Sequence, residues 1–93
     1  MNIVLRETFL RACRDLGAEE HAALVQLLLC LKAALKDPAR HSGLGLRKLQ
    51  PHPIWEVRLG LKIRALFRVD NDQAIFLFAG SHDDVVRFLR SLR

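Results

Sequence analysis

The chain has 93 residues, of which 51% are hydrophobic and 27% charged; this composition predicts one folded domain, residues 1–93, and excludes intrinsic disorder. The formal net charge is +5, and it falls in the second half: residues 1–39 carry five Lys/Arg and five acids, residues 40–93 carry ten and five. This uneven charge favours a polyanionic partner, nucleic acid rather than membrane, over a basic surface that serves only solubility.

The first part of the chain shows helical spacing of its apolar residues. A short strand at residues 2–5 precedes a helix over residues 7–16, which Gly17 ends, and a second helix over residues 18–36, which Pro38 stops. The apolar residues of the second helix extend beyond one stripe. We therefore expect a second surface of this helix to be covered, either by the first helix or by another copy of the chain in a homodimer.

The cysteines and the apolar segments bear on the cellular location. Cys13 and Cys30 lie among Leu and Ala in helical patterns, where a free cysteine acts as a small apolar residue. Without a recognisable secretion signal they indicate a reducing, cytoplasmic setting. The longest apolar run, residues 21–35, contains Gln26 and Lys32 and is too short for a membrane span.

Residues 40–50 read as a loop that carries Arg47 and Lys48. Three runs follow that have the period of two typical of strands, IWEVRL, IRALFRV and AIFLFA. A three-residue connection over residues 60–62 keeps the apolar residues of the first two runs on one face. The pairs it predicts are Trp55–Phe67, Val57–Ala65, Leu59–Ile63 and Arg58–Arg64. A turn over residues 70–73 predicts the pairs Val69–Ala74, Phe67–Phe76, Ala65–Phe78 and Arg64–Ala79.

A last helix follows, which Ser81 or Asp83 can cap. Its inward residues are Val85, Phe88, Leu89 and Leu92, and its outward residues are Arg87, Arg90 and Arg93. The sequence thus predicts an α+β domain, with two N-terminal helices packed on one face of a three- to four-stranded, mainly antiparallel sheet, a short C-terminal helix, and the other face open.

The open face is the candidate functional site, because guanidinium groups on a rigid strand suit phosphate recognition. The candidate phosphate-binding residues are Arg58, Arg68, Lys48, Lys62 and Arg47, around the candidate catalytic residues Arg64, His82 and Glu56. The histidines are scattered and the cysteines stand 17 positions apart, so the sequence predicts neither a metal site nor a cofactor.

Cleavage of RNA without a metal ion is the reaction that these side chains could perform. The 2′-hydroxyl would attack the adjacent phosphorus while arginines stabilise the extra negative charge. His82 suits the acid or the base at neutral pH. Glu56 could be the other proton-transfer group, or it could serve only to separate and orient two arginines.

The second half of the chain resembles the RelE/ParE superfamily of toxins from type II toxin-antitoxin modules. The residues that carry the resemblance are Leu46-Arg47-Lys48-Leu49, Ile54-Trp55-Glu56-Val57-Arg58, Ile63-Arg64-Ala65-Leu66-Phe67 and Ser81-His82-Asp83-Asp84. The last motif is similar to a branch of RelE-like domains in which a tyrosine follows two positions later. This chain contains no tyrosine, and Val86 stands at that place.

The resemblance implies a cytoplasmic bacterial toxin that a cognate antitoxin neutralises, and, for the RelE branch, an endoribonuclease that cleaves mRNA at the ribosome. It assigns Arg64 to the scissile phosphate, Lys48 to a basic position before the hairpin and His82 to the late acid or base. Two alternatives stay open: a catalytically degenerate RelE-like module that binds nucleic acid or protein, and a ParE-like inhibitor of gyrase.

Overall fold

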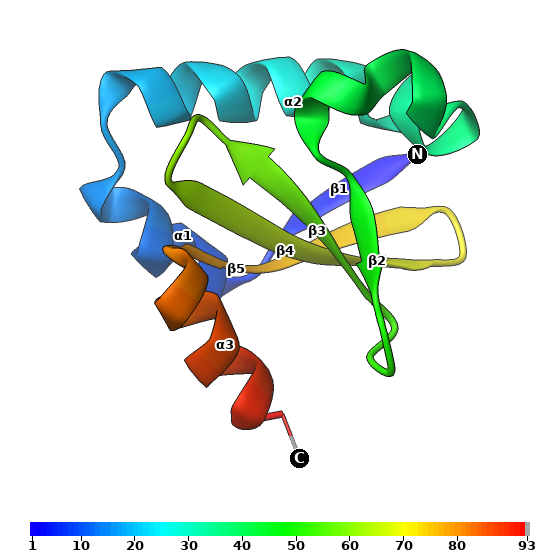
Figure 1. Cartoon of the computed structure of the whole chain (residues 1–93). Helices are drawn as coiled ribbons and strands as arrows, with labels where there is room; N and C mark the ends of the chain where they lie inside the picture. Colours follow the sequence, from blue (N-terminus) through cyan, green and yellow to red (C-terminus); the bar gives the residue numbers. More distant parts are fainter. Residues whose placement is uncertain (93) are drawn as a thin grey trace.

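A computed structural model describes residues 1–92 (Figure 1); Arg93, the last arginine expected on the outer side of the final helix, lies outside the described residues. The elements are β1 (Asn2–Leu5), α1 (Glu7–Ala12), the 3-10 helix η1 (Cys13–Asp15), α2 (Ala18–Lys36), the 3-10 helix η2 (Pro38–Leu44), β2 (Arg47–Leu49), β3 (Ile54–Leu59), β4 (Ile63–Asp70), β5 (Gln73–Gly80) and α3 (His82–Arg90).

The predicted α+β class is confirmed, and the sheet is larger than expected. Its five strands lie in the order β1-β5-β4-β3-β2, with β1 parallel to β5 and every other pair antiparallel. The extra strand is β2, which lies inside the predicted loop over residues 40–50. Three residues are too few to show a period of two, so only the pairing with β3 reveals this strand.

The predicted hairpin of β3 and β4 is confirmed pair by pair, and Arg58 stands opposite Arg64. Its connection begins at Gly60, which has a φ of +73°, a backbone conformation that suits glycine. The alternation of side chains along these two strands therefore follows the sequence pattern. The charged residues lie on one face, which Ile54 and Leu66 share with them.

The pairing of β4 with β5 departs from the prediction because of a bulge between Leu66 and Phe67. The two predicted pairs beyond it, Ala65–Phe78 and Arg64–Ala79, are wrong, and the observed pairs are Leu66–Phe78, Ala65–Ala79 and Arg64–Gly80. One extra residue reverses which side chains of β5 point to each face. Phe78 consequently leaves the main core and stacks on Phe88 of α3, with ring centroids 4.8 Å apart.

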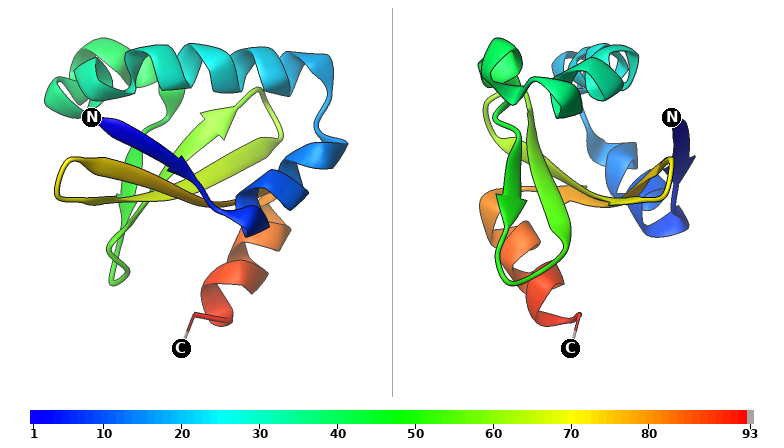
Figure 2. Two further views of the ribbon diagram at one scale, coloured as in Figure 1. Left: turned by 180° about the vertical axis from the view of Figure 1, so that it is seen from behind. Right: turned by 90° about the vertical axis from the view of Figure 1, so that its right-hand side faces the viewer.

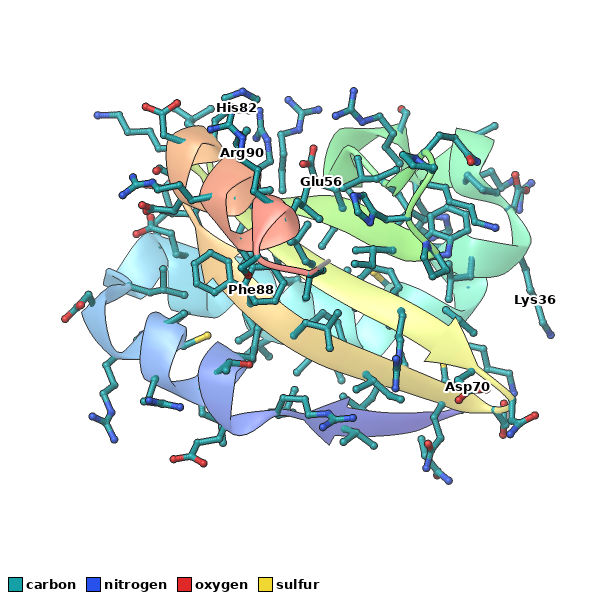
Figure 3. All side chains as sticks on the ribbon, turned by 90° about the horizontal axis from the view of Figure 1, so that it is seen from below. Lys36, Glu56, Asp70, His82, Phe88 and Arg90 are labelled. Carbon is teal, nitrogen blue, oxygen red and sulfur yellow. The ribbon has the colours of Figure 1, made fainter. Side chains whose placement is uncertain are left out.

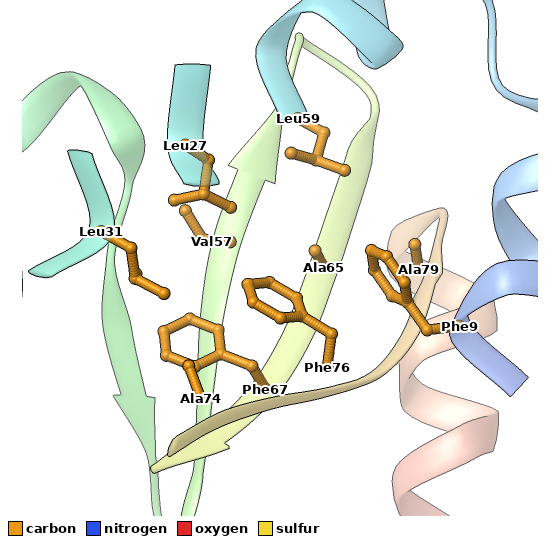
Figure 4. Close-up of a cluster of buried hydrophobic side chains, with 10 residues drawn as sticks. All are labelled: Phe9, Leu27, Leu31, Val57, Leu59, Ala65, Phe67, Ala74, Phe76 and Ala79. Atoms are coloured by element: carbon orange, nitrogen blue, oxygen red, sulfur yellow. The ribbon is translucent and has the colours of Figure 1, made fainter. Parts of the chain in front are cut away.

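Helices cover both faces of the sheet, which corrects the expectation of an open face. On one face, α1 and α2 enclose the main core, where Phe9, Leu27 and Leu31 meet side chains of β3, β4 and β5 (Figure 4). On the other face, Val85 of α3 packs with Ile54 and Leu66 in a second, smaller core. Figure 2 shows α2 above the sheet and α3 below it. The two cores arise because β4 and β5 carry apolar side chains on both faces of the sheet where the helices pack.

The helix α2 has the predicted bounds, and the carboxylate of Glu20 accepts a hydrogen bond from the Gly17 backbone N–H at 2.9 Å to fix its start. Only part of its apolar surface is covered: Val25 is 56% and Leu29 is 79% exposed. None of the helices in residues 1–92 combines the length and the hydrophobicity that a membrane span requires.

Candidate phosphate-binding site

The centre of the site is Glu56, which is only 8% exposed. It lies on the face of β3 opposite the main core, which we call the outer face. Its Oε1 atom lies 3.6 Å from the Nε of Arg64 on β4 and 3.5 Å from the Nη2 of Arg47 on β2. A carboxylate with so little access to water needs such cationic partners. One carboxylate thus holds two guanidinium groups from the strands on either side of it, and we call Arg47, Glu56, Arg58 and Arg64 the outer-face cluster.

Arg64 is the most enclosed arginine of this cluster, with its side chain 27% exposed. Its Nη1 atom is buried and has no hydrogen-bond partner among the described residues. Two cations facing one carboxylate leave the cluster with excess positive charge and with unused donors. It can therefore accept an anion such as a phosphate, which offers several oxygens to forked donors.

Arg58 contributes a third guanidinium, and Gly45 positions it. A Cβ atom at Gly45 would overlap the Nε of Arg58, so the arginine packs directly on the glycine backbone. Gly45 also has a φ of +64°, which side chains rarely adopt. Glycine at this place therefore serves both the turn from η2 into β2 and the close approach of Arg58.

The end of β5 brings the start of α3 close to Arg64. Gly80 pairs with Arg64, and a Cβ at Gly80 would lie 2.8 Å from the Cβ of Asp84. Because of the bulge, His82 follows the strand partner of Arg64 by two residues instead of the expected three, about 7 Å of extended chain. Figure 3 shows His82, which is exposed, at the same end of the sheet as Glu56.

A capping box fixes the entry into α3. The Ser81 hydroxyl accepts a hydrogen bond from the Asp84 backbone N–H, and the Asp84 carboxylate accepts one from the Ser81 backbone N–H, both at 3.2 Å. The hydrogen bonds from Ser81, with a smaller contribution from Arg87, hold the pKa of Asp84 below its usual value. The cap therefore contains a carboxylate that stays ionised, and it leaves His82 at the first position of the helix.

Arg68 does not join the outer-face cluster, although it lies on the same face of β4 as Arg64. Leu66 lies between the two arginines and is fully buried, because Val85 of α3 packs over it. The single basic patch expected from the strand pattern is thus divided by α3, which the alternation of side chains along β4 could not reveal.

The two candidate lysines lie elsewhere. Lys48 pairs with Trp55, whose side chain packs against the core beneath α2, so Lys48 points to the opposite face from Arg64. Lys62, in the turn between β3 and β4, lines a hollow together with Glu19 and Glu20 at the start of α2. Neither lysine is placed beside the outer-face cluster, whereas Arg47 is.

Two further observations concern possible metal ligands and the Cys13 thiol. Within residues 1–92, no group of three or more His, Cys, Asp or Glu side chains gathers in a way that could hold a metal ion. Burial raises the pKa of the Cys13 thiol, which makes this residue a poor nucleophile.

Comparison with known proteins extends the description of the fold. No family model and no curated protein matches the chain. Among solved structures, a copper-bound mutant toxin from Helicobacter pylori has a TM-score of 0.69 at 19% identity and covers 91% of this chain and 98% of its own. The RelB-RelE antitoxin-toxin complex from Methanococcus jannaschii gives 0.65 at 14% identity, with coverages of 91% and 96%.

The toxin-antitoxin complex RelBE2 from Mycobacterium tuberculosis gives a TM-score of 0.61 at 19% identity and covers 87% of this chain and 96% of its own. These values show that the chain has the fold of the RelE-like toxins over nearly its whole length. The resemblance drawn from the sequence motifs is confirmed for the fold, while the assignment to a branch with a His-Asp-Asp motif stays a prediction.

Proposed function

We propose that this chain, which has the fold of the RelE-like toxins, is the toxin of a type II toxin-antitoxin module and cleaves mRNA at the ribosome. The observation that carries the proposal is the outer-face cluster: Glu56 holds Arg64 half-buried, with an unused donor, at the end of the sheet where His82 begins α3. The solved toxins and toxin-antitoxin complexes of the same fold support the biological class.

In the proposed reaction, the 2′-hydroxyl of the nucleotide preceding the scissile bond attacks phosphorus as it loses its proton to a base. The bond to the 5′-oxygen of the next nucleotide breaks, and an acid returns a proton to that oxygen. Arg64 binds the phosphate and stabilises the additional negative charge of the pentacoordinate transition state, aided by Arg58 and Arg47. His82 acts as the acid or the base.

Glu56 has a structural role in this proposal. Its carboxylate is nearly inaccessible to water and is already engaged with Arg64 and Arg47. We therefore assign Glu56 to the orientation of the two arginines rather than to proton transfer.

The proposed partner is a cognate antitoxin, as in the RelB-RelE and RelBE2 complexes. The net charge of +5 favours a partner with acidic segments, since opposite potentials accelerate association. Neutralisation requires only that the partner cover the outer-face cluster or block its approach to the ribosome.

Expression of the chain alone in a bacterial host tests the proposal. Growth arrest is expected, with breaks in translated mRNA mapped by primer extension, and Arg64→Ala should abolish both. Arg14→Ala, which removes an exposed arginine from η1, is the matched control and should remain toxic. Unaffected growth and intact mRNA, despite soluble wild-type protein, would contradict the proposal, and DNA damage with intact mRNA would indicate gyrase inhibition instead.

A second candidate function is binding of RNA without cleavage. The absence of tyrosine favours it: Val86, at the position where the related branch has the aromatic residue, is aliphatic and can neither stack on a base nor donate a proton. It lies in a hollow with His52, Leu89 and Arg90. Binding through three phosphate contacts predicts a slope of about −2 in the plot of log affinity against log salt for single-stranded RNA. Such binding with intact ribosome-bound mRNA would select this function.

A further inference from the structure

A concave site lies on the other side of α3 from the outer-face cluster. It has a volume of about 500 Å³, and it lies where α3 meets the sheet on the side of β1 and α1. Figure 3 shows Phe88, one of its lining residues, and Glu56 on opposite sides of α3. This volume falls within the range of small-molecule sites, about 300–1,000 Å³.

The polar lining of this pocket includes two cations. Arg6 and Arg68 both line it, together with the polar side chains of Thr8 and His52. Within residues 1–92, neither arginine has a carboxylate oxygen within the 4.0 Å of an ion pair, and the Nε of Arg68 is buried without a hydrogen-bond partner. Two guanidinium groups with no acidic partner in the described chain favour an anion.

The fold holds the two arginines on the same side of the sheet. Arg68 pairs with Ile75 of β5, and Ile75 pairs in turn with Val4 of β1. Arg6 follows Val4 by two residues, and its backbone N–H donates to the carbonyl of Phe76 at 3.0 Å. The parallel pairing of β1 with β5 therefore brings a cation from the N-terminal segment to the pocket that Arg68 enters from β4.

Most of the remaining lining is apolar. Ile54 is buried and Leu77 half-buried, and Phe88 is fixed by its stack on Phe78, with an interplanar angle of 6°. Small-molecule sites combine such walls with a few convergent polar groups. The walls suit the flat apolar body of a ligand, and the guanidinium groups suit its oxyanion.

We propose that this pocket binds a small organic anion, in which a carboxylate or phosphate lies between Arg6 and Arg68 and an aromatic or similarly flat apolar body packs against Ile54, Leu77 and Phe88. The site is separate from the outer-face cluster, because the buried contact of Val85 with Leu66 lies between Arg64 and Arg68. Its assignment does not depend on the proposed cleavage of RNA.

The test compares three probes that share a naphthalene ring: 1-naphthaleneacetate, 1-naphthyl phosphate and the uncharged 2-(1-naphthyl)ethanol. Titration of the full chain, followed by amide chemical shifts, should give shifts at Leu77 and Phe88. At least one anion should bind about tenfold more tightly than the alcohol, as expected for charge-assisted hydrogen bonds. The tighter of the two anions identifies the preferred oxyanion.

Variants separate the pocket from general attraction to a basic protein. Arg6→Gln and Arg68→Gln should each weaken binding of the preferred anion about tenfold, whereas Arg14→Gln should not change it. Arg6 is exposed, so its variant keeps the test valid even if Arg68→Gln impairs folding.

Three results would overturn the proposal. One is equal affinity for the anions and the alcohol, and another is unchanged affinity in Arg6→Gln. The third is displacement of the probe by a six-nucleotide RNA whose binding also depends on Arg68, which would make the pocket part of a surface for a polymer. Loss of toxicity in Arg64→Ala would not bear on any of these measurements, so the two proposals fail independently.

Discussion

Replacement of Glu56 by glutamine tests whether this residue holds the arginines in place. The change keeps the size of the side chain and removes its charge. The partly buried guanidinium of Arg64 then lacks the counter-charge of Glu56. At the 3.6 Å between Glu56 Oε1 and Arg64 Nε, the Coulomb attraction is about 5 kcal/mol at an effective dielectric constant of about 20.

The cost of burying the carboxylate offsets much of this attraction, and glutamine keeps one oxygen that can accept a hydrogen bond. A net loss of about 2 kcal/mol in the free energy of unfolding is therefore expected, in the range for hydrogen bonds to charged groups. In a chain of this length, the loss corresponds to a fall of about 10 °C in Tm.

Urea unfolding monitored by Trp55 fluorescence measures this change. Trp55 lies on the neighbouring position of β3 and stacks on Phe67, so its emission reports on the sheet. Glu7→Gln is the matched control, because Glu7 is 83% exposed and lies 3.9 Å from its partner Arg11; its effect should stay within about 0.5 kcal/mol.

A loss for Glu56→Gln no larger than that of the control would refute the reasoning. The growth and mRNA-cleavage assays test the role of Glu56 a second time with the same variant. If Glu56 orients the arginines, weaker cleavage should accompany the loss of stability, and the conservative Glu56→Asp should restore part of both. Normal stability with cleavage abolished would instead identify Glu56 as the proton-transfer group.

Other variants test the local structure around the site. Gly45→Ala should lower the free energy of unfolding by about 1–2 kcal/mol, because its positive φ disfavours a side chain and its Cβ would displace Arg58; an unchanged urea midpoint would contradict this. Since hydrogen bonds from Ser81 lower the pKa of Asp84 in the folded chain, its carboxylate stabilises folding above about pH 4, and this contribution is lost as the pH falls through the lowered pKa. Asp84→Asn should therefore lose less stability than the wild type between about pH 5 and pH 2, and equal losses would refute the linkage. If a second copy covers the exposed side of α2, sedimentation should show a dimer that Leu29→Glu disrupts. A wild-type monomer at high concentration would contradict the homodimer.

Local patterns in the sequence were sufficient for much of the architecture. The alternation along β3 and β4 predicted their register and placed Glu56, Arg58 and Arg64 on one face, because a strand has a strict period of two and its connection has only a few suitable lengths. The bounds of α2 followed from its spacing and from the proline after it. These features depend on residues close together in the chain, and the sequence by itself determined them.

Only the tertiary structure decided which charged residues share a site. The bulge in β5 moved His82 nearer to Arg64, and the packing of Val85 on Leu66 separated Arg68 from the cluster. The bulge and this packing both depend on how distant segments pack together, which no local pattern in the sequence records. The pairing of β1 with β5 brought Arg6 to Arg68 across more than sixty residues of chain. Periodicity determines the face on which a side chain lies, whereas the neighbours on that face depend on contacts between distant segments, and for this reason the second pocket became visible only in the folded chain.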